Sequence, residues 1–488
     1  MPFVHETSNK LAHNRILANP KIKESLSKYK VKCDPGEFTE KIQEKFIDIT
    51  PLRYSCSSVF SIDSGFDFVP VNERFPSAEV GFMQFSLNLV KLAERSKVVV
   101  NGIVNPIEYN KITNAHTHSL DLPIFNTSID GHSNLTDSIR FKINDYFKSS
   151  RTYNNESPSL LDTLYLLLSE DDIARNFNCI EDPCKKQFAA VREKSKNNTM
   201  EWKESKKLLK KEDFNNANKT AKCPFCKREL LLIDYLRLHE TIDEEFGARG
   251  ILSRLARVVE QLYPINLIMS ILSQKNRLGK DHCLKTLSQI AFILDGPLAI
   301  FGEPAKVSRS IHRYLLSVNE MLMDYSLEPL VFFGLTKSGL VVDHVNLLLE
   351  HIKKKSLVGS YEKRLPKSKI LLIDDEYRFK YIQPKMGSGS FGAETYYGQD
   401  IVYFDPNGKP YVINVMYPVD KSSKYFRKMF FSHVSYKNLG KIAALINELE
   451  VDIYENALLP IVLAHKYASI SLKPGVSSLE DFAKSIIS

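Results

Sequence analysis

Residues 291–305 read AFILDGPLAIFGEPA, and this stretch decides the fold. The uninterrupted apolar run from Ile290 to Leu294 predicts a buried strand. Asp295 and Gly296 follow at once, so the strand ends in a carboxylate and in a residue suited to a tight turn. A buried strand is rigid, and an acid at its end is therefore held at one edge of a sheet, where a ligand can reach it.

A second stretch, residues 60–65 (FSIDSG), repeats this design. An apolar strand runs into Asp63, and the following Ser64 and Gly65 predict that the strand ends there. If the two strands lie side by side, Asp63 and Asp295 meet at one sheet edge and can hold a hard divalent cation such as Mg²⁺ or Mn²⁺. Either aspartate alone is ordinary turn chemistry, so the prediction depends on the pair.

Strands and helices alternate along the rest of the chain, which indicates a three-layer α/β core. The apolar patterns also separate a helical N-terminal arm, residues 1–54, from the sheet that follows. Strands are expected over residues 80–92, 96–103, 330–334, 370–373, 400–404 and 411–417, and helices over residues 21–29, 35–49, 160–168, 251–272, 307–323, 341–354, 438–449 and 458–468.

The composition is that of a globular protein, with 43% hydrophobic and 25% charged residues among 488. No run approaches the roughly 18 apolar residues of a membrane span, and the N-terminus lacks the layout of a secretory signal. We therefore expect a cytoplasmic protein without a membrane partner. The net charge of +8 permits a polyanion partner such as DNA but does not require one.

Four of the seven cysteines form two pairs. Cys223 and Cys226 have the two-residue spacing of a zinc knuckle, while four residues lie between Cys179 and Cys184. Together they predict a closed, structural zinc site; the alternative is four reduced, idle thiols. Residues 179–226 are otherwise rich in Lys and Asn, which predicts a solvated insertion rather than a DNA-binding face. The insertion divides a main domain into residues 55–178 and 227–488.

His116 and His118 have the spacing of a metal-binding His-x-His pair. They lie in a polar stretch of Asn and Thr residues without further matching ligands, so we expect a surface loop there.

The ordered set of motifs resembles the NurA family of nucleases over roughly residues 55–475. The matching segments are residues 291–305, 334–339 (GLTKSG) and 458–466 (LLPIVLAHK), together with the Asp63 motif and residues 75–81 (FPSAEVG). Two departures concern the turns, since the family's usual Asp-Gly-Ser reads Asp63-Ser64-Gly65 here, and Pro297 occupies a position often held by serine. Both aspartates remain, so the departures leave the proposed ligands in place.

The resemblance implies an RNase H-like mixed sheet flanked by helices, and cleavage of DNA that depends on Mn²⁺ or Mg²⁺. It also implies a homodimer that works with a HerA-type hexameric ATPase in DNA end processing or anti-phage defence. Carried over by position, Asp63 and Asp295 become metal ligands, and Glu260 on a helix becomes the third, with Glu240 as its rival. His465 matches a late family histidine near the metal or phosphate; a structural histidine is the alternative.

Lys337, in the GLTKSG motif, would contact phosphate by the same resemblance, although an exposed turn lysine explains it equally. Two other functions stay open. One is a non-catalytic DNA-binding or scaffolding subunit of the ATPase complex, and the other is a different phosphoryl-transfer enzyme on the same fold, because a fold does not determine a substrate.

Overall fold

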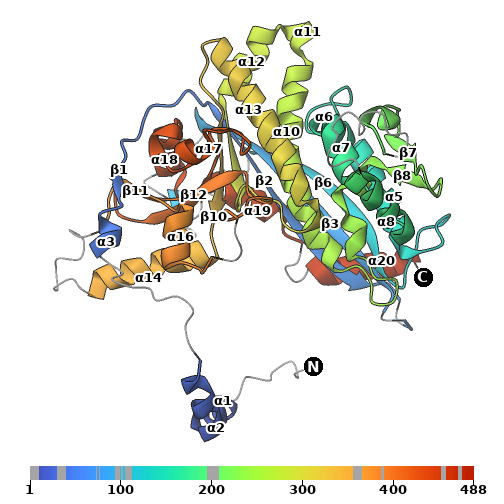
Figure 1. Ribbon diagram of the computed structural model, residues 1–488, viewed down its shortest axis with the longest axis horizontal. Helices are drawn as coiled ribbons and strands as arrows, with labels where there is room; N and C mark the ends of the chain where they lie inside the picture. The colour runs from blue at the N-terminus through green and yellow to red at the C-terminus, as the bar shows by residue number, and fades with distance from the viewer. Residues whose placement is uncertain are drawn as a thin grey trace.

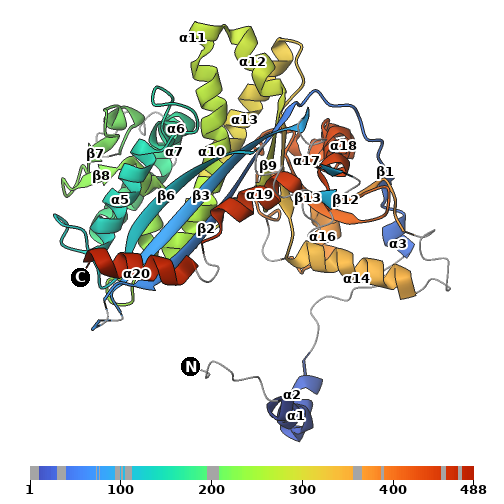
Figure 2. The ribbon, with the colours of Figure 1, turned by 180° about the vertical axis from the view of Figure 1, so that it is seen from behind.

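A nine-stranded sheet with helices on both faces forms the body of the protein (Figures 1 and 2). The computed structural model describes residues 10–29, 40–72, 74–75, 77–93, 99–100, 103–104, 113–194, 208–354, 365–385, 389–451, 458–470 and 475–487. Along the sheet the strands are β1 (Ile47–Asp48), β11 (Lys369–Leu372), β12 (Gly398–Phe404), β13 (Pro410–Met416), β10 (Val331–Thr336), β9 (Ile290–Asp295), β2 (Ser58–Pro70), β3 (Glu79–Lys91) and β6 (Thr113–Phe125).

The connections of the central strands confirm the expected RNase H-like sheet. Strands β2, β3 and β6 follow one another as antiparallel neighbours. Strands β9 and β10 come later in the chain and lie on the other side of β2, both parallel to it. The first strand of this core, β2, thus lies between the second, β3, and the fourth, β9. Beyond β10, the sheet continues with the antiparallel strands β13, β12, β11 and β1.

One face of the central sheet is covered by the apolar helix α10 (Gly250–Ser273), which packs on β2, β3 and β9. Residues 250–278 are long and apolar enough to cross a membrane by length and composition, but 83% of their most apolar window is buried inside the protein. Such burial is typical of a core helix. On the same face lie α5 (Leu135–Ser149), α6 (Leu160–Leu167), α13 (Val307–Asp324), α14 (Leu340–Lys354) and α16 (Asp375–Tyr381).

The opposite face carries α18 (Leu439–Leu449) and α19 (Leu459–Ala468). Helix α19 approaches β2 so closely that a Cβ at Gly65 would lie 2.1 Å from the carbonyl oxygen of Ala468. The buried Ser61 hydroxyl also donates to the carbonyl of Pro460 at 2.8 Å. These contacts place the end of α19 over the middle of β2.

The remaining helices are α1 (Lys10–Ala18), α2 (Pro20–Ser27), α3 (Glu40–Gln43), α7 (Glu170–Asn176), α8 (Asp182–Lys194), α11 (Lys275–Leu278), α12 (Lys280–Ser288), α17 (Phe426–Phe430) and α20 (Gly475–Ile487).

Four local expectations were wrong. Strand β2 does not end at Asp63 but continues to Pro70, because β3 pairs with it along its whole length. The third strand of the core is β6, and it contains His116 and His118, which were expected in a loop. His118 stacks on the ring of Tyr263 at 5.3 Å, so packing on α10 compensates for the polar sequence of this strand. The segment expected as a strand over residues 96–103 instead contributes to the short antiparallel pair β4 (Val99–Val100) and β5 (Ile103–Val104). The helix expected over residues 35–49 ends at Gln43, before β1 begins.

The two ends of the lysine-rich segment are packed into the protein rather than solvated. Phe188 on α8 and Phe214 are fully buried, and both belong to the same hydrophobic core as α10. Leu208 and Leu209 are buried with them. The centre of the run, residues 195–207, lies outside the described residues.

Close contact between β10 and the turn after β9 requires a glycine at position 334. A Cβ on Gly334 would lie 2.1 Å from the carbonyl oxygen of Gly296, a backbone atom that cannot move aside easily. We expect Gly334→Ala to lower the free energy of unfolding by about 1–3 kcal/mol or more, as overpacking does. Gly250→Ala is the matched control, because nothing lies within 4 Å of its Cβ position and alanine favours the helix. Chemical denaturation measures both, and equal stabilities would contradict the expectation.

Candidate functional site

Asp63 and Asp295 occupy neighbouring positions on two adjacent parallel strands. The register pairs Ile62 of β2 with Leu294 of β9, so the next residue on each strand is an aspartate. Adjacent strands lie about 4.8 Å apart, and side chains at matched positions of parallel strands point to the same face. The structure thus brings together the two carboxylates that the sequence singled out.

The aspartates lie where the sheet opens. Up to Ile62, strand β2 is paired on both sides, with β9 and with β3. Strand β9 ends at Asp295, and from Asp63 onward the described pairing of β2 is with β3 alone. Gly296 turns the chain away with φ of +105°, a conformation that glycine adopts readily. The opening therefore results from the end of one strand beside another that continues.

Glu260 reaches this opening from α10, on the other face of the sheet. Alternation along β2 turns Asp63 toward α19 and Ser64 toward α10. The Ser64 hydroxyl donates to Glu260 Oε1 at 2.5 Å. Glu260 is 8% exposed, and burial raises its pKa to about 7, with the charges of Asp63 and Asp295 adding to the rise and Arg257 opposing it. The charges of both aspartates therefore reach Glu260 from the other face of the sheet.

His465 and Lys337 contact the two aspartates directly. His465 Nδ1 lies 2.8 Å from Asp63 Oδ2, and its side chain is 69% exposed, so its other nitrogen faces outward. Lys337 Nζ donates to Asp295 Oδ2 at 2.8 Å. Lys337 comes two residues after Leu335, the partner of Asp295 in β10, so strand alternation explains its direction. Five of the predicted residues therefore gather in one place, and the rival Glu240 does not join them; the five are Asp63, Glu260, Asp295, Lys337 and His465.

The pKa of Asp63 is raised as well. Burial is the main cause, and the charge of Asp295 is the second. The hydrogen bonds from His465 and from the backbone N–H of Ser64 act in the opposite direction without cancelling the rise. Both Asp63 and Glu260 would thus ionise more readily if positive charge were added beside them.

Arg257 and Ser64 complete the site, although the sequence had suggested no role for them. Arg257 Nη1 lies 3.2 Å from Glu260 Oε2 and donates to the carbonyl oxygen of Asp295 at 3.1 Å. Its position three residues before Glu260 on α10 was a usable signal, because residues at this spacing share a helix face. Ser64 stands where the related motif has glycine, and this departure supplies the hydroxyl that holds Glu260.

Glu240, the rival for the third carboxylate, is engaged elsewhere. Its two oxygens accept hydrogen bonds from Arg237 at 2.9 and 2.6 Å, and Lys185 lies 3.7 Å away. Burial opposes its charge, but these cations lower its pKa. Glu240 is thus a charge-paired carboxylate outside the group around Asp63 and Asp295.

The carboxylate group fits a divalent cation by its chemistry. Its oxygens are the donors that Mg²⁺ and Mn²⁺ prefer, and two of the acids have raised pKa values that a cation would lower. Lys337 donates a hydrogen bond to an oxygen of Asp295, and Ser64 donates one to an oxygen of Glu260. Within the part of the chain that the structure describes, the four cysteines alone bring three or more ligand atoms within 4.8 Å of one another, so the carboxylates form the looser group.

Cys179, Cys184, Cys223 and Cys226 meet as the sequence predicted. Their sulfur atoms all lie within 4.8 Å of one another, and three of the four side chains are buried. Burial disfavours the Cys226 thiolate, but the backbone N–H of Arg228 and the neighbouring thiols outweigh burial and lower its pKa. Four converging thiols can hold a metal ion.

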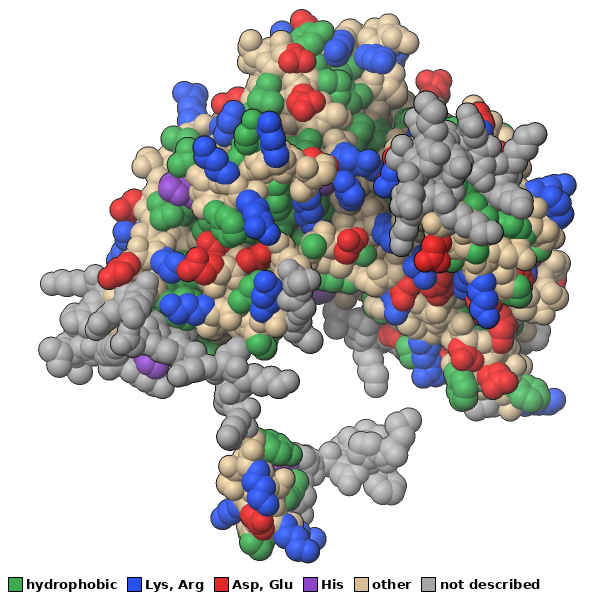
Figure 3. All heavy atoms as spheres, in the orientation of Figure 1, with side chains coloured by type: hydrophobic (Ala, Val, Ile, Leu, Met, Phe, Trp, Pro, Cys, Tyr) green, Lys and Arg blue, Asp and Glu red, His purple; other side chains and the backbone are tan. Residues whose placement is uncertain are grey.

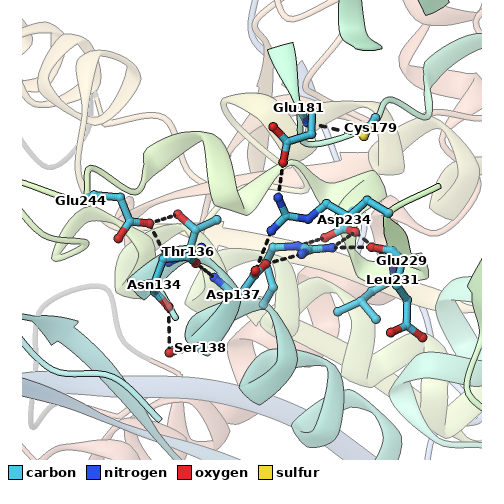
Figure 4. Close-up of polar contacts among 12 residues, drawn as sticks. Asn134, Thr136, Asp137, Ser138, Cys179, Glu181, Glu229, Leu231, Asp234 and Glu244 are labelled. Atoms are coloured by element: carbon cyan, nitrogen blue, oxygen red, sulfur yellow. Dashed lines mark hydrogen bonds and ion pairs between the residues drawn. The ribbon is translucent and has the colours of Figure 1, made fainter. Parts of the chain in front are cut away.

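A charged network fastens the cysteine group to α5 (Figure 4). Glu181 forms an ion pair with Arg228, and Arg228 donates to Asp137 Oδ2 of α5 at 2.5 Å. Arg140, also on α5, is bound by Asp137 at 2.6 Å and by the buried Asp234 at 2.6 Å. The cysteine group is therefore part of the folded body.

Comparison with known proteins gives one set of similar structures. No family model matches the chain, and no curated protein matches it. The similar structures are NurA nucleases. The NurA nuclease from Sulfolobus solfataricus is 9% identical, with 99% of this chain and 98% of that chain covered, at a TM-score of 0.34. A second NurA structure is 12% identical (98% and 95% covered, TM-score 0.28), and a NurA with manganese is 12% identical (98% and 99% covered, TM-score 0.27).

These structures belong to the family that the sequence motifs resemble, and the similarity spans both chains almost from end to end. With identities of 12% or less and TM-scores below 0.5, it assigns no residue a role. The function proposed below therefore depends on the side chains of this chain.

The raised pKa of Glu260 predicts a pH-dependent stability. In the folded protein this pKa is about 7, against 4.5 for an ordinary glutamate, so the folded state holds a proton that the unfolded state releases between these pH values. Stability contributed by this proton is lost as pH rises through this window, by about 1–3 kcal/mol. We expect Glu260→Gln to gain stability relative to the wild type between about pH 5 and pH 8.

Thermal unfolding of both proteins across this pH range measures the effect. Buried histidines such as His118 and His312 titrate in both proteins, so the difference between the two curves isolates Glu260. A difference that does not change with pH would show that Glu260 has no raised pKa.

Proposed function

We propose that this protein is a metal-dependent DNA nuclease in which Asp63, Asp295 and Glu260 hold the divalent cation. The observation that carries the proposal is the convergence of three acids at the point where β9 ends, with two of them raised in pKa by burial and by mutual repulsion. Buried acids that repel one another are costly unless a cation joins them. Perturbed acids of this kind are typical of functional sites.

The residues around the acids have separate tasks in this proposal. When bound, divalent ions supply an activated water and stabilise the leaving oxygen of a phosphodiester. His465 holds Asp63 in orientation through its Nδ1 contact and presents its other nitrogen to the phosphate. Ser64 and Arg257 hold Glu260. Lys337 moves from Asp295 to a phosphate oxygen, because the cation would take over the charge of that carboxylate.

The sequence resemblance extends this proposal to partners. We propose a cytoplasmic homodimer that works with a HerA-type hexameric ATPase in DNA end processing or in anti-phage defence. The basis is the ordered set of motifs from Asp63 to His465. Co-purification with such an ATPase, and the mass of the free protein in solution, test these two points.

Loss of activity on removing one carboxylate charge is the direct test of the nuclease. With linear DNA and Mn²⁺, we expect Asp63→Asn and Asp295→Asn each to lower the cleavage rate by about a hundredfold or more, since each removes a charged ligand. Asp67→Asn is the matched control, because Asp67 lies on β2 four residues further along and has no contact with the group. Nuclease assays with and without chelator measure the rates.

The outcomes separate the competing functions. Cleavage by the wild type that both variants retain would reject the site. DNA binding without cleavage in any condition, including the presence of the ATPase, would favour the non-catalytic scaffold.

We also propose that the four cysteines bind a structural zinc ion. The support is the set of four sulfur atoms within 4.8 Å of one another, in a chain with an odd number of cysteines. A site closed by four thiolates leaves no position for a substrate, so its role would be to hold residues 179–184 beside residues 223–226.

Metal analysis tests the zinc site. We expect about one zinc ion per chain, and Cys223→Ser should lose it and unfold at a lower temperature, because binding energy of a structural zinc is folding energy. Cys283→Ser is the control, since Cys283 is a buried cysteine outside the group. Zinc-free protein of unchanged stability would reject the site.

A further inference from the structure

Exposed cations and aromatic rings gather around α17, the short helix that follows β13. We call this the basic-aromatic surface; it consists of Lys424, Tyr425, Arg427, Lys428 and Phe431, all exposed to solvent. Tyr425 is 56% exposed and Phe431 is 46% exposed. In Figure 3, Lys and Arg side chains gather on the face of the molecule where α17 and α13 lie.

The helix beneath the exposed rings is held firmly. Phe426 and Phe430 stack on each other with centroids 5.3 Å apart, and Tyr417 contacts both rings at 5.3 and 5.5 Å. The Tyr436 hydroxyl donates to the carbonyl of Phe430 at 3.1 Å. The ring of Phe431 also contacts Phe430, with centroids 5.0 Å apart, but it remains 46% exposed, and the inner rings anchor α17 beneath it.

The cations of this surface lack neutralising acids. From residue 421 to residue 437 the sequence has five Lys or Arg residues and no Asp or Glu. In the described part of the chain, no ion pair engages Lys424, Arg427 or Lys428. Lys424 instead lies 5.0 Å from the ring centroid of Tyr425, so charge and ring are presented together.

The basic-aromatic surface lies toward the end of the sheet where β10 begins, since Met429 of α17 lines a cavity with Pro329 and Leu330. A series of contacts leads from the chain just before this surface to the segment that follows Asp295. The chain that leaves Asp295 reaches Ala299, which forms a β-bridge with Tyr396. Lys421 donates to the carbonyl oxygens of Ala393, at 2.7 Å, and of Tyr396, and it lies three residues before Lys424. The segment after Asp295 and Lys421, which precedes the basic-aromatic surface, therefore contact the same loop, residues 393–396.

We propose that the basic-aromatic surface binds an unpaired nucleic-acid strand. Bases would stack on Tyr425 and Phe431, and phosphates would pair with Lys424, Arg427 and Lys428, the combination used by proteins that bind single strands. Duplex DNA hides its base faces, so exposed rings among cations favour an unpaired strand. The inference rests on the proposed nuclease function and adds the form of its substrate.

Binding is measured by fluorescence anisotropy of a labelled oligothymidylate about 15 nucleotides long, with the full-length protein in chelator so that no cleavage occurs. The first variant is Tyr425→Ala with Phe431→Ala, and its control is Tyr153→Ala with Phe246→Ala, two rings that are exposed elsewhere. The charge variant is K424Q/R427Q/K428Q, and its control of equal charge is K275Q/R277Q/K280Q on α11 and α12.

We expect the aromatic variant to bind roughly tenfold or more weakly with an unchanged salt dependence, because stacking is lost and phosphate contacts remain. The charge variant should flatten the slope of log K against log salt by about 2, from three lost phosphate contacts. Blunt duplex should be bound equally by the wild type and by the aromatic variant.

The inference is overturned if the controls weaken binding as much as the variants, or if the aromatic variant loses duplex binding as well. Competition by polyglutamate as effective as by oligothymidylate would also overturn it, and would point to an acidic protein partner. Cleavage with Mn²⁺ is measured separately. If the wild type cleaves DNA but the variants bind oligothymidylate as well as their controls do, this inference alone is rejected. If the variants specifically lose binding but the wild type does not cleave, the proposed nuclease alone is rejected.

Discussion

The parallel pairing of β2 with β9 is the constraint on which the rest of the site depends. It stops at Ile62 and Leu294, one residue before an aspartate on each strand. Because β9 then turns away at Gly296 while β2 continues along β3, the sheet opens beside both acids. Gly334 and Gly65 allow the turn after β9 and the end of α19 to approach this opening closely, so small residues determine its shape.

Charge in the opening is incompletely balanced by the side chains present. Arg257 and Lys337 each contact an acid, yet burial and repulsion still raise the pKa values of Asp63 and Glu260. A site that merely stabilised the fold would be expected to pair such acids fully, as Arg140 is paired with Asp234 beneath the cysteine group. This contrast between the two buried networks is the physical reason why we propose a catalytic role for the acids around Asp63 and a structural role for the network beneath the cysteines.

The functions proposed for the two networks and for the surface around α17 fall in different parts of the molecule. The acids lie at the centre of the sheet, the network around the cysteines connects a peripheral segment to α5, and the basic-aromatic surface follows Lys421, which contacts the loop of residues 393–396. No ion pair engages Lys424, Arg427 or Lys428 in the described part of the chain, whereas Arg228 beside the cysteine group is held by Asp137 and Glu181.

The sequence by itself determined the long apolar elements, such as α10 and β9, and the two Asp-bearing strands, because apolar periodicity and a terminal acid are local signals. It also determined the cysteine group, through its spacing. The polar strand β6 and the continuation of β2 past Asp63 depended on pairing with β3, a contact that local patterns do not contain. Likewise, the tertiary fold alone places Glu260 rather than Glu240 beside the aspartates and brings Arg257 and Ser64 to them, because partners distant in sequence determine where a buried charge is balanced.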